Sequence, residues 1–183
     1  LVTNLLRFTQ SGENWVKSSF NEQELTFTRE TTSTGESFIT HPKAYLALEK
    51  NTQYTLSAWI KSNGKVKSLD IWCYDKNTDH PQSKSNISVN TTWQFVTWTF
   101  TTNNYSNSDY SQTTIRFDNN GSTTQGTNAI LYVKKPKLEI GNKATDWQPS
   151  SEDYSTTTEM NSAITQKANE ISARIDQIED VTN

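Results

Sequence analysis

Apolar and polar residues alternate along much of the first 153 residues, in which no run shows helical spacing. A period of two is typical of strands that turn one face towards a core. The clearest runs are residues 24–29, 53–61, 68–75, 93–101, 113–118, 129–133 and 137–140. Shorter runs at residues 5–8, 37–40 and 45–48 are further candidates for strands.

Turn-forming residues separate these runs. Glycine or asparagine supplies the turn at Thr34-Gly35, Asn63-Gly64, Asn119-Asn120-Gly121 and Gly126. Many short strands that are joined by polar turns, with no helix between them, predict an antiparallel all-β sandwich or barrel.

The pattern changes after Tyr154, where glycine, proline and aromatic residues no longer occur. Apolar residues then recur at alternating spacings of four and three, at Ile164, Ala168, Ile171, Ile175 and Ile178. This narrow seam predicts a coiled-coil helix capped near Ser155, and isoleucine at both seam positions favours a trimer over a dimer. The alternative is a helix that folds back onto the sandwich. We therefore divide the chain into residues 1–153 and 154–183.

Charge and composition narrow the possible partners. The 183 residues carry a net charge of −3, with 11% aromatic residues and a mean hydropathy of −0.80. Residues 156–183 contain two basic and five acidic residues, so the remaining body is neutral. A neutral body offers no basic face for phosphates, and nucleic acid is not an expected partner. No apolar stretch approaches the length of a membrane span, so membrane insertion is not expected either.

Residues that would support catalysis are few. The two histidines, His41 and His80, each precede a proline in polar sequence, and we expect both to lie in exposed loops. The single cysteine, Cys73, lies in an apolar run and is expected to be a buried thiol. A pairing of Asp70 with Asp118 has no feature that favours acid–base chemistry over hydrogen bonding. The sequence therefore predicts no enzyme, no metal site and no cofactor.

The alternation also indicates which side chains point away from the core. In each run the apolar set occupies every second position, so the intervening residues must face outwards. We expect these outward residues to share one face and to form a carbohydrate-binding groove, comprising Trp59, Asp70, Trp72, Tyr74, Arg116, Asp118 and Tyr132. Aromatic rings stack on the apolar faces of sugars, while arginine and aspartate bond hydroxyls. The alternative is that Trp59 or Trp72 packs beneath a loop.

Four segments together resemble a known family. These are "NLL" at 4–6, "YTLSAWIKS" at 54–62, "WQFVTWTFT" at 93–101 and "ILYVKKPKLEIGNKATDWQPSSED" at 130–153. They are similar to the jelly-roll carbohydrate-binding modules found beside bacterial polysaccharide hydrolases. The last segment is more similar still to modules of tail and baseplate proteins in phages that infect Gram-positive bacteria.

The resemblance implies a jelly-roll sandwich followed by a helical, often trimeric, segment. It implies a virion protein of the tail tip or baseplate that binds host cell-wall or surface polysaccharide and associates through its helix. Two alternatives remain: a structural spacer that binds no glycan, and a targeting module of a polysaccharide hydrolase. Related hydrolase modules often hold a structural calcium ion with an acidic residue in the last long strand. Lys134 and Lys135 stand there instead, so we expect no calcium at this position.

Overall fold

A computed structural model describes residues 3–15, 25–46, 48–74, 82–104, 113–153 and 157–182. The chain divides into two compact units, Leu1–Ser150 and Ser151–Asn183. We describe each unit by itself.

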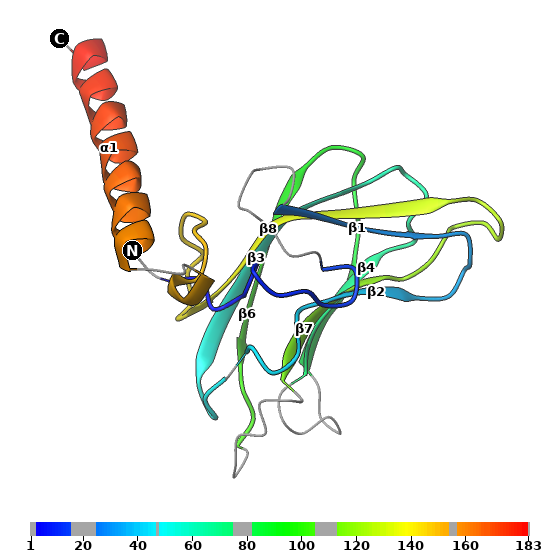
Figure 1. The fold of residues 1–183 in the computed structure, drawn as a ribbon. Coiled ribbons are helices and arrows are strands. Elements are labelled where there is room, and N and C mark those ends of the chain that lie inside the picture. Colours follow the sequence, from blue (N-terminus) through cyan, green and yellow to red (C-terminus); the bar gives the residue numbers. More distant parts are fainter. Residues whose placement is uncertain are drawn as a thin grey trace. The chain divides into compact units, whose positions relative to one another are not determined.

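The first unit is built from two four-stranded antiparallel sheets that enclose a common core (Figure 1). Sheet one has the strand order β1 (Thr26–Thr31), β8 (Ala129–Ile140), β3 (Gln53–Ser62) and β6 (Gln94–Thr101). Sheet two has the order β2 (Ser37–Thr40), β7 (Thr114–Asn119), β4 (Leu69–Tyr74) and β5 (Gln82–Ile87). The predicted all-β, antiparallel, sandwich-like architecture is confirmed.

Most alternating runs form strands close to their predicted bounds, with three differences. The runs at 129–133 and 137–140 belong to one strand, β8. Residues 5–8 form no strand, and neither do the described residues among 45–48. Strand β5, with the sequence QSKSNI, was not predicted because it has no apolar alternation.

The polar sequence of β5 suits its place at the edge of sheet two. Lys84 Nζ donates to the Thr97 carbonyl at 2.9 Å, and the Gln82 side-chain amide donates to the Thr101 carbonyl. Both acceptors lie on β6 of sheet one, so these bonds close one open side of the sandwich with polar groups.

The core contains a stack of rings from the N-terminal segment. Trp15 is fully buried, with ring centroids 4.2 Å from Phe27 and 5.3 Å from Phe8. His41 packs edge-on against Trp15 at 5.1 Å and is also fully buried, so the prediction of an exposed loop histidine is wrong. Its Nε2 accepts the Arg7 backbone N–H at 2.8 Å, and burial lowers the pKa of His41 to about 3. The other histidine of the chain, His80, lies outside the described residues.

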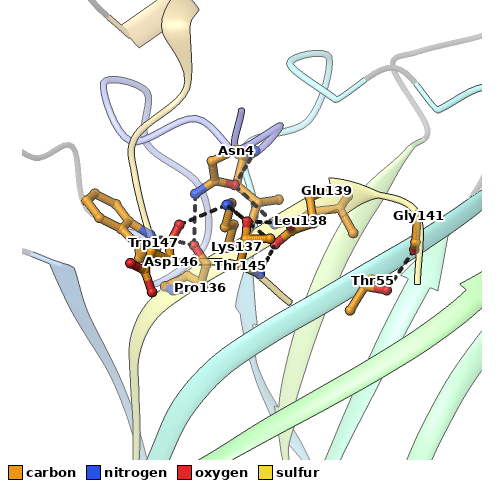
Figure 2. A network of polar contacts seen from close by, with 11 residues as sticks. Asn4, Thr55, Pro136, Lys137, Leu138, Glu139, Gly141, Thr145, Asp146 and Trp147 are labelled. Carbon is orange, nitrogen blue, oxygen red and sulfur yellow. Dashed lines mark hydrogen bonds and ion pairs between the residues drawn. The ribbon is translucent and has the colours of Figure 1, made fainter. Parts of the chain in front are cut away.

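A bulge in β8 anchors both ends of this unit (Figure 2). The ladder between β3 and β8 changes register between Ser57 and Trp59, and Lys135 opposite has a positive φ of 49°. The carbonyl of Pro136 accepts Asn4 Nδ2 at 3.1 Å and Trp147 Nε1 at 2.9 Å. Because regular pairing is interrupted here, side chains from the two termini supply the hydrogen bonds.

The N-terminal segment runs alongside the end of β8 and bonds to it. Asn4 Oδ1 accepts the backbone N–H groups of Leu6 and Leu138, each at 3.1 Å, and the Leu5 N–H bonds the Leu138 carbonyl at 2.9 Å. Trp147 packs edge-on against Phe8 with ring centroids 5.5 Å apart. Trp147 is half-buried against the core.

A buried ion pair lies on the outer side of β8. Lys137 and Glu139 are each 1% exposed, and Lys137 Nζ is 3.5 Å from Glu139 Oε2. Lys137 also donates to Thr145 Oγ1 at 2.6 Å and to the Asp146 carbonyl at 2.9 Å. The Thr145 hydroxyl and N–H donate to the Glu139 carboxylate at 2.6 and 3.1 Å (Figure 2). Burial lowers the pKa of Lys137, and the Glu139 carboxylate opposes that change.

The second unit consists of a short 3₁₀ turn, η2 (Ser151–Asp153), and the helix α1 (Thr157–Thr182). The four seam isoleucines described with side chains are 40–64% exposed, namely Ile164, Ile171, Ile175 and Ile178. The predicted cap at Ser155 lies outside the described residues. Within the described chain, α1 lacks the length of apolar sequence that crossing a bilayer requires.

The buried ion pair makes a testable contribution to stability. We expect Lys137→Met to lower the free energy of unfolding by about 3 kcal/mol, because Glu139 keeps its charge and loses its partner. Lys143→Met, at an exposed lysine nearby, should change it by less than about 0.5 kcal/mol. Urea unfolding of the full chain measures both values, and equal losses in the two variants would contradict this role.

Candidate functional site

Five of the predicted site residues lie together on the outer side of sheet two. Strands β4 and β7 pair so that Trp72 lies opposite Arg116, and Asp70 lies opposite Asp118. Leu69, Ile71 and Cys73 between them are buried, which turns their neighbours outwards. Strand β2 adds Phe38, opposite Asp118. We call this surface the β4/β7 face; it comprises Phe38, Asp70, Trp72, Tyr74, Arg116 and Asp118.

The aromatic rings of the β4/β7 face form a short platform. Trp72 and Tyr74 stack with ring centroids 5.9 Å apart and an interplanar angle of 26°. The guanidinium carbon of Arg116 lies 3.9 Å from the Phe38 ring centre and 4.9 Å from that of Tyr74. The arginine is thus held between two rings, a contact that favours its charged form. The Trp72 indole N–H is buried, and no described residue accepts it.

Asp118 fixes the orientation of Arg116. Its two carboxylate oxygens accept Arg116 Nε at 2.7 Å and Nη2 at 3.0 Å, and its side chain is fully buried. Burial raises the pKa of Asp118 to about 6, although the Arg116 hydrogen bonds and charge lower it. A buried carboxylate has no free surface for a ligand, so its role is to position the arginine.

Asp70 is likewise held by the protein. One carboxylate oxygen accepts the Asn86 backbone N–H at 2.7 Å and the Asn120 side-chain amide at 2.9 Å. Asn86 has a positive φ of 58° in a strand whose register with β4 shifts at this point. Asp70 therefore stabilises an irregular edge strand beside the platform.

Trp59 and Tyr132 lie elsewhere, on the outer side of sheet one. Trp59 belongs to β3 and is 39% exposed, while Tyr132 belongs to β8. The prediction that the whole set shares one face is therefore wrong. Alternation distinguishes inward from outward positions on a strand, but it does not reveal which of the two sheets contains that strand.

Sequence reasoning also missed Phe38, which completes the aromatic contacts of Arg116. The run SFIT offered the signal, because Ile39 is fully buried and its neighbour Phe38 must therefore point outwards. Within the described part of the chain, histidine, cysteine and acidic side chains form no group of three suited to a metal ion.

Comparison with known proteins adds information on the fold. No family model matches the chain, and no curated protein matches it. The tripod from the baseplate of bacteriophage Tuc2009 is 16% identical with a TM-score of 0.50, covering 84% of this chain and 60% of that chain. At this identity, the likeness shows a shared fold.

Two further solved structures are similar at a lower TM-score, 0.46 in both cases. A CBM4 structure is 15% identical and covers 76% of this chain and 94% of its own. The N-terminal cellulose-binding domain of Cellulomonas fimi β-1,4-glucanase C is 13% identical and covers 69% and 84%, respectively.

The raised pKa of Asp118 leads to a prediction of pH dependence. The folded value of about 6 lies above the ordinary 3.8, so the folded protein binds this proton more tightly than the unfolded chain. The contribution of Asp118 to stability is therefore greatest below pH 3.8 and is lost as the pH rises through about 6. Carbon-13 NMR of the Asp118 carboxyl should show a midpoint near pH 6. A midpoint near 4 would show that burial does not raise the pKa of this carboxyl group.

Proposed function

We propose that the chain is a non-catalytic carbohydrate-binding module with a jelly-roll sandwich, and that the β4/β7 face binds polysaccharide. The observation that carries the proposal is the stacked pair of Trp72 and Tyr74 beside an arginine fixed by Asp118. The two rings offer flat apolar surface, and Arg116 offers charged donors at its edge. A pyranose ring presents the complementary combination of an apolar face and a rim of hydroxyls.

The arginine is already oriented before a ligand binds. Asp118 and the two flanking rings restrict its rotamers, so binding costs less side-chain entropy than it would for a free arginine. Two of its five N–H donors bond Asp118, which leaves donors for hydroxyl oxygens. The buried Trp72 N–H also lacks an acceptor among the described residues, and such a donor is costly unless a partner reaches it.

We further place the module in the tail tip or baseplate of a phage, where it binds host cell-wall or surface polysaccharide during adsorption. Support comes from the resemblance of residues 130–153 to modules of such tail proteins. The likeness to the baseplate tripod shows the fold and is compatible with this setting. The competing functions are a structural spacer without glycan binding and a targeting module of a bacterial polysaccharide hydrolase.

Assembly through α1 is the second part of the proposal. The seam isoleucines are exposed along one stripe of the helix, a pattern that suits partner helices better than a sheet surface. Isoleucine at both seam positions favours a trimer. Few heptads are present, so association should be weak and should increase with concentration.

Substitution on the β4/β7 face tests glycan binding. We expect Trp72→Ala and Tyr74→Ala each to weaken binding to the best-bound polysaccharide of a glycan array by about thirtyfold, or about 2 kcal/mol. Ile140→Ala is the control, because it removes an exposed apolar side chain of sheet one. Isothermal titration measures affinity, and circular dichroism confirms that each variant is folded.

Two results would contradict glycan binding by this face. One is the absence of binding to any glycan on the array or to intact Gram-positive cells, which would favour a structural spacer. The other is unchanged affinity in folded Trp72→Ala and Tyr74→Ala variants, which would place the glycan elsewhere.

Charge substitution in the helical seam tests self-association. We expect the full chain with Ile171→Asp and Ile175→Asp to sediment as a monomer at concentrations where the unsubstituted chain associates, because buried carboxylates oppose seam packing. The matched control, Ser172→Asp with Gln177→Asp, adds the same charge outside the seam and should associate as before. If the seam variant still associates, self-association must be due to the sandwich instead of α1.

A further inference from the structure

The outer side of sheet one carries a second group of exposed rings. In the ladder, Trp59 of β3 lies opposite both Phe95 of β6 and Lys134 of β8. Two residues along β3, Lys61 lies opposite Tyr132. Trp93, just before β6, contacts both lysines. We call this surface the β3/β6 face; it comprises Trp59, Lys61, Trp93, Phe95, Tyr132 and Lys134.

The rings and cations of the β3/β6 face are closely arranged. The rings of Trp59 and Phe95 are 5.0 Å apart and are 39% and 48% exposed. Lys134 Nζ lies 4.3 Å from the Trp93 ring centre. Lys61 Nζ lies 4.8 Å from the Trp93 ring centre and 5.1 Å from that of Tyr132. Among the described residues, neither lysine has a carboxylate partner.

The two halves of the outer side of sheet one differ in how far they are covered by other residues. Towards the end of β8, residues 141–147 cover polar side chains, and Thr55, Ser57, Lys137 and Glu139 are each at most 3% exposed. The aromatic half remains exposed. Burial of aromatic rings is more favourable than burial of hydroxyls and charges. The segment nevertheless covers the polar half, and the apolar half stays exposed to a possible ligand. An exposed aromatic cluster of this kind indicates a binding surface.

We propose that the β3/β6 face is a second binding site, for a glycan that carries negatively charged groups. The Trp59 and Phe95 rings stack on sugar faces, while the ammonium groups of Lys61 and Lys134 bind carboxylate or phosphate substituents. Charge complementarity favours this occupant, because two lysines without carboxylate partners lie within the aromatic cluster. Their charges would be costly beneath an apolar protein surface. This site lies on a different sheet from the β4/β7 face and does not depend on that proposal.

Indole NMR resonances can locate this binding directly. The chain has six tryptophans, and Trp→Phe variants assign their ¹⁵N–H signals. The probes are oligogalacturonate, a phosphorylated mannan and a neutral cello-oligosaccharide. We expect at least one charged probe to shift the signals of Trp59 and Trp93, less so at high salt, whereas the neutral probe leaves them unchanged. The two charged probes distinguish carboxylate from phosphate as the bound group.

Matched lysine variants complete the test. Lys61→Gln with Lys134→Gln should lower the affinity for the charged probe by about tenfold, a loss of about 1.4 kcal/mol. Lys65→Gln with Lys67→Gln removes the same charge from exposed positions after β3 and should leave affinity unchanged. The shift of the Trp59 signal by the charged probe should persist in Trp72→Ala, which separates this site from the β4/β7 face.

Four outcomes would overturn the proposal. In the first, neither charged probe shifts Trp59. In the second, the neutral probe shifts Trp59 equally. In the third, both lysine pairs lose the same affinity. In the fourth, the Trp59 signal of the ligand-free chain changes with protein concentration or with the Ile171→Asp substitution, which would identify a second copy or α1 as the occupant.

Discussion

The hydrogen bonding of one carbonyl group organises much of the sandwich. A bulge in β8 releases the Pro136 carbonyl from regular pairing, and the side chains of Asn4 and Trp147 both donate to it. Asn4 then bonds Leu138 and brings the N-terminal segment beside β8, from where Phe8 and Trp15 enter the core. Trp147 directs the last segment across the outer side of sheet one. The bulge thus determines where both ends of the domain lie.

The path of that last segment determines which part of the outer side of sheet one is covered. Thr145 bonds Glu139 and accepts from Lys137, so the segment covers a charged pair that is well supplied with hydrogen bonds. Because the segment is bonded over this pair, it does not cover the rings of β3 and β6, which stay exposed. On the opposite sheet, the buried Asp118 orients Arg116 between Phe38 and Tyr74. In both places a buried carboxylate fixes the groups around it.

The sequence predicts the strands well and their arrangement poorly. Period-two alternation identifies β3, β4, β6 and β7 and their outward side chains, because one face of each strand is buried. It does not assign Trp59 and Trp72 to different sheets, since pairing between distant strands determines that. It also misses β5, whose polar side chains bond β6, and the bulge that joins two apparent runs into β8. His41 was misplaced because a polar neighbourhood in sequence does not reveal burial beneath Trp15.

The attachment of both ends to Pro136 also determines how the domain bears mechanical load. Asn4 and Trp147 are far apart in the sequence but share one acceptor, so a pull on the two ends of the sandwich acts across this small region. Tension would reach these side-chain hydrogen bonds and the Phe8–Trp147 contact before it reached the strand ladders. The β4/β7 and β3/β6 faces, which are formed by the ladders, would keep their geometry under forces that loosen the ends.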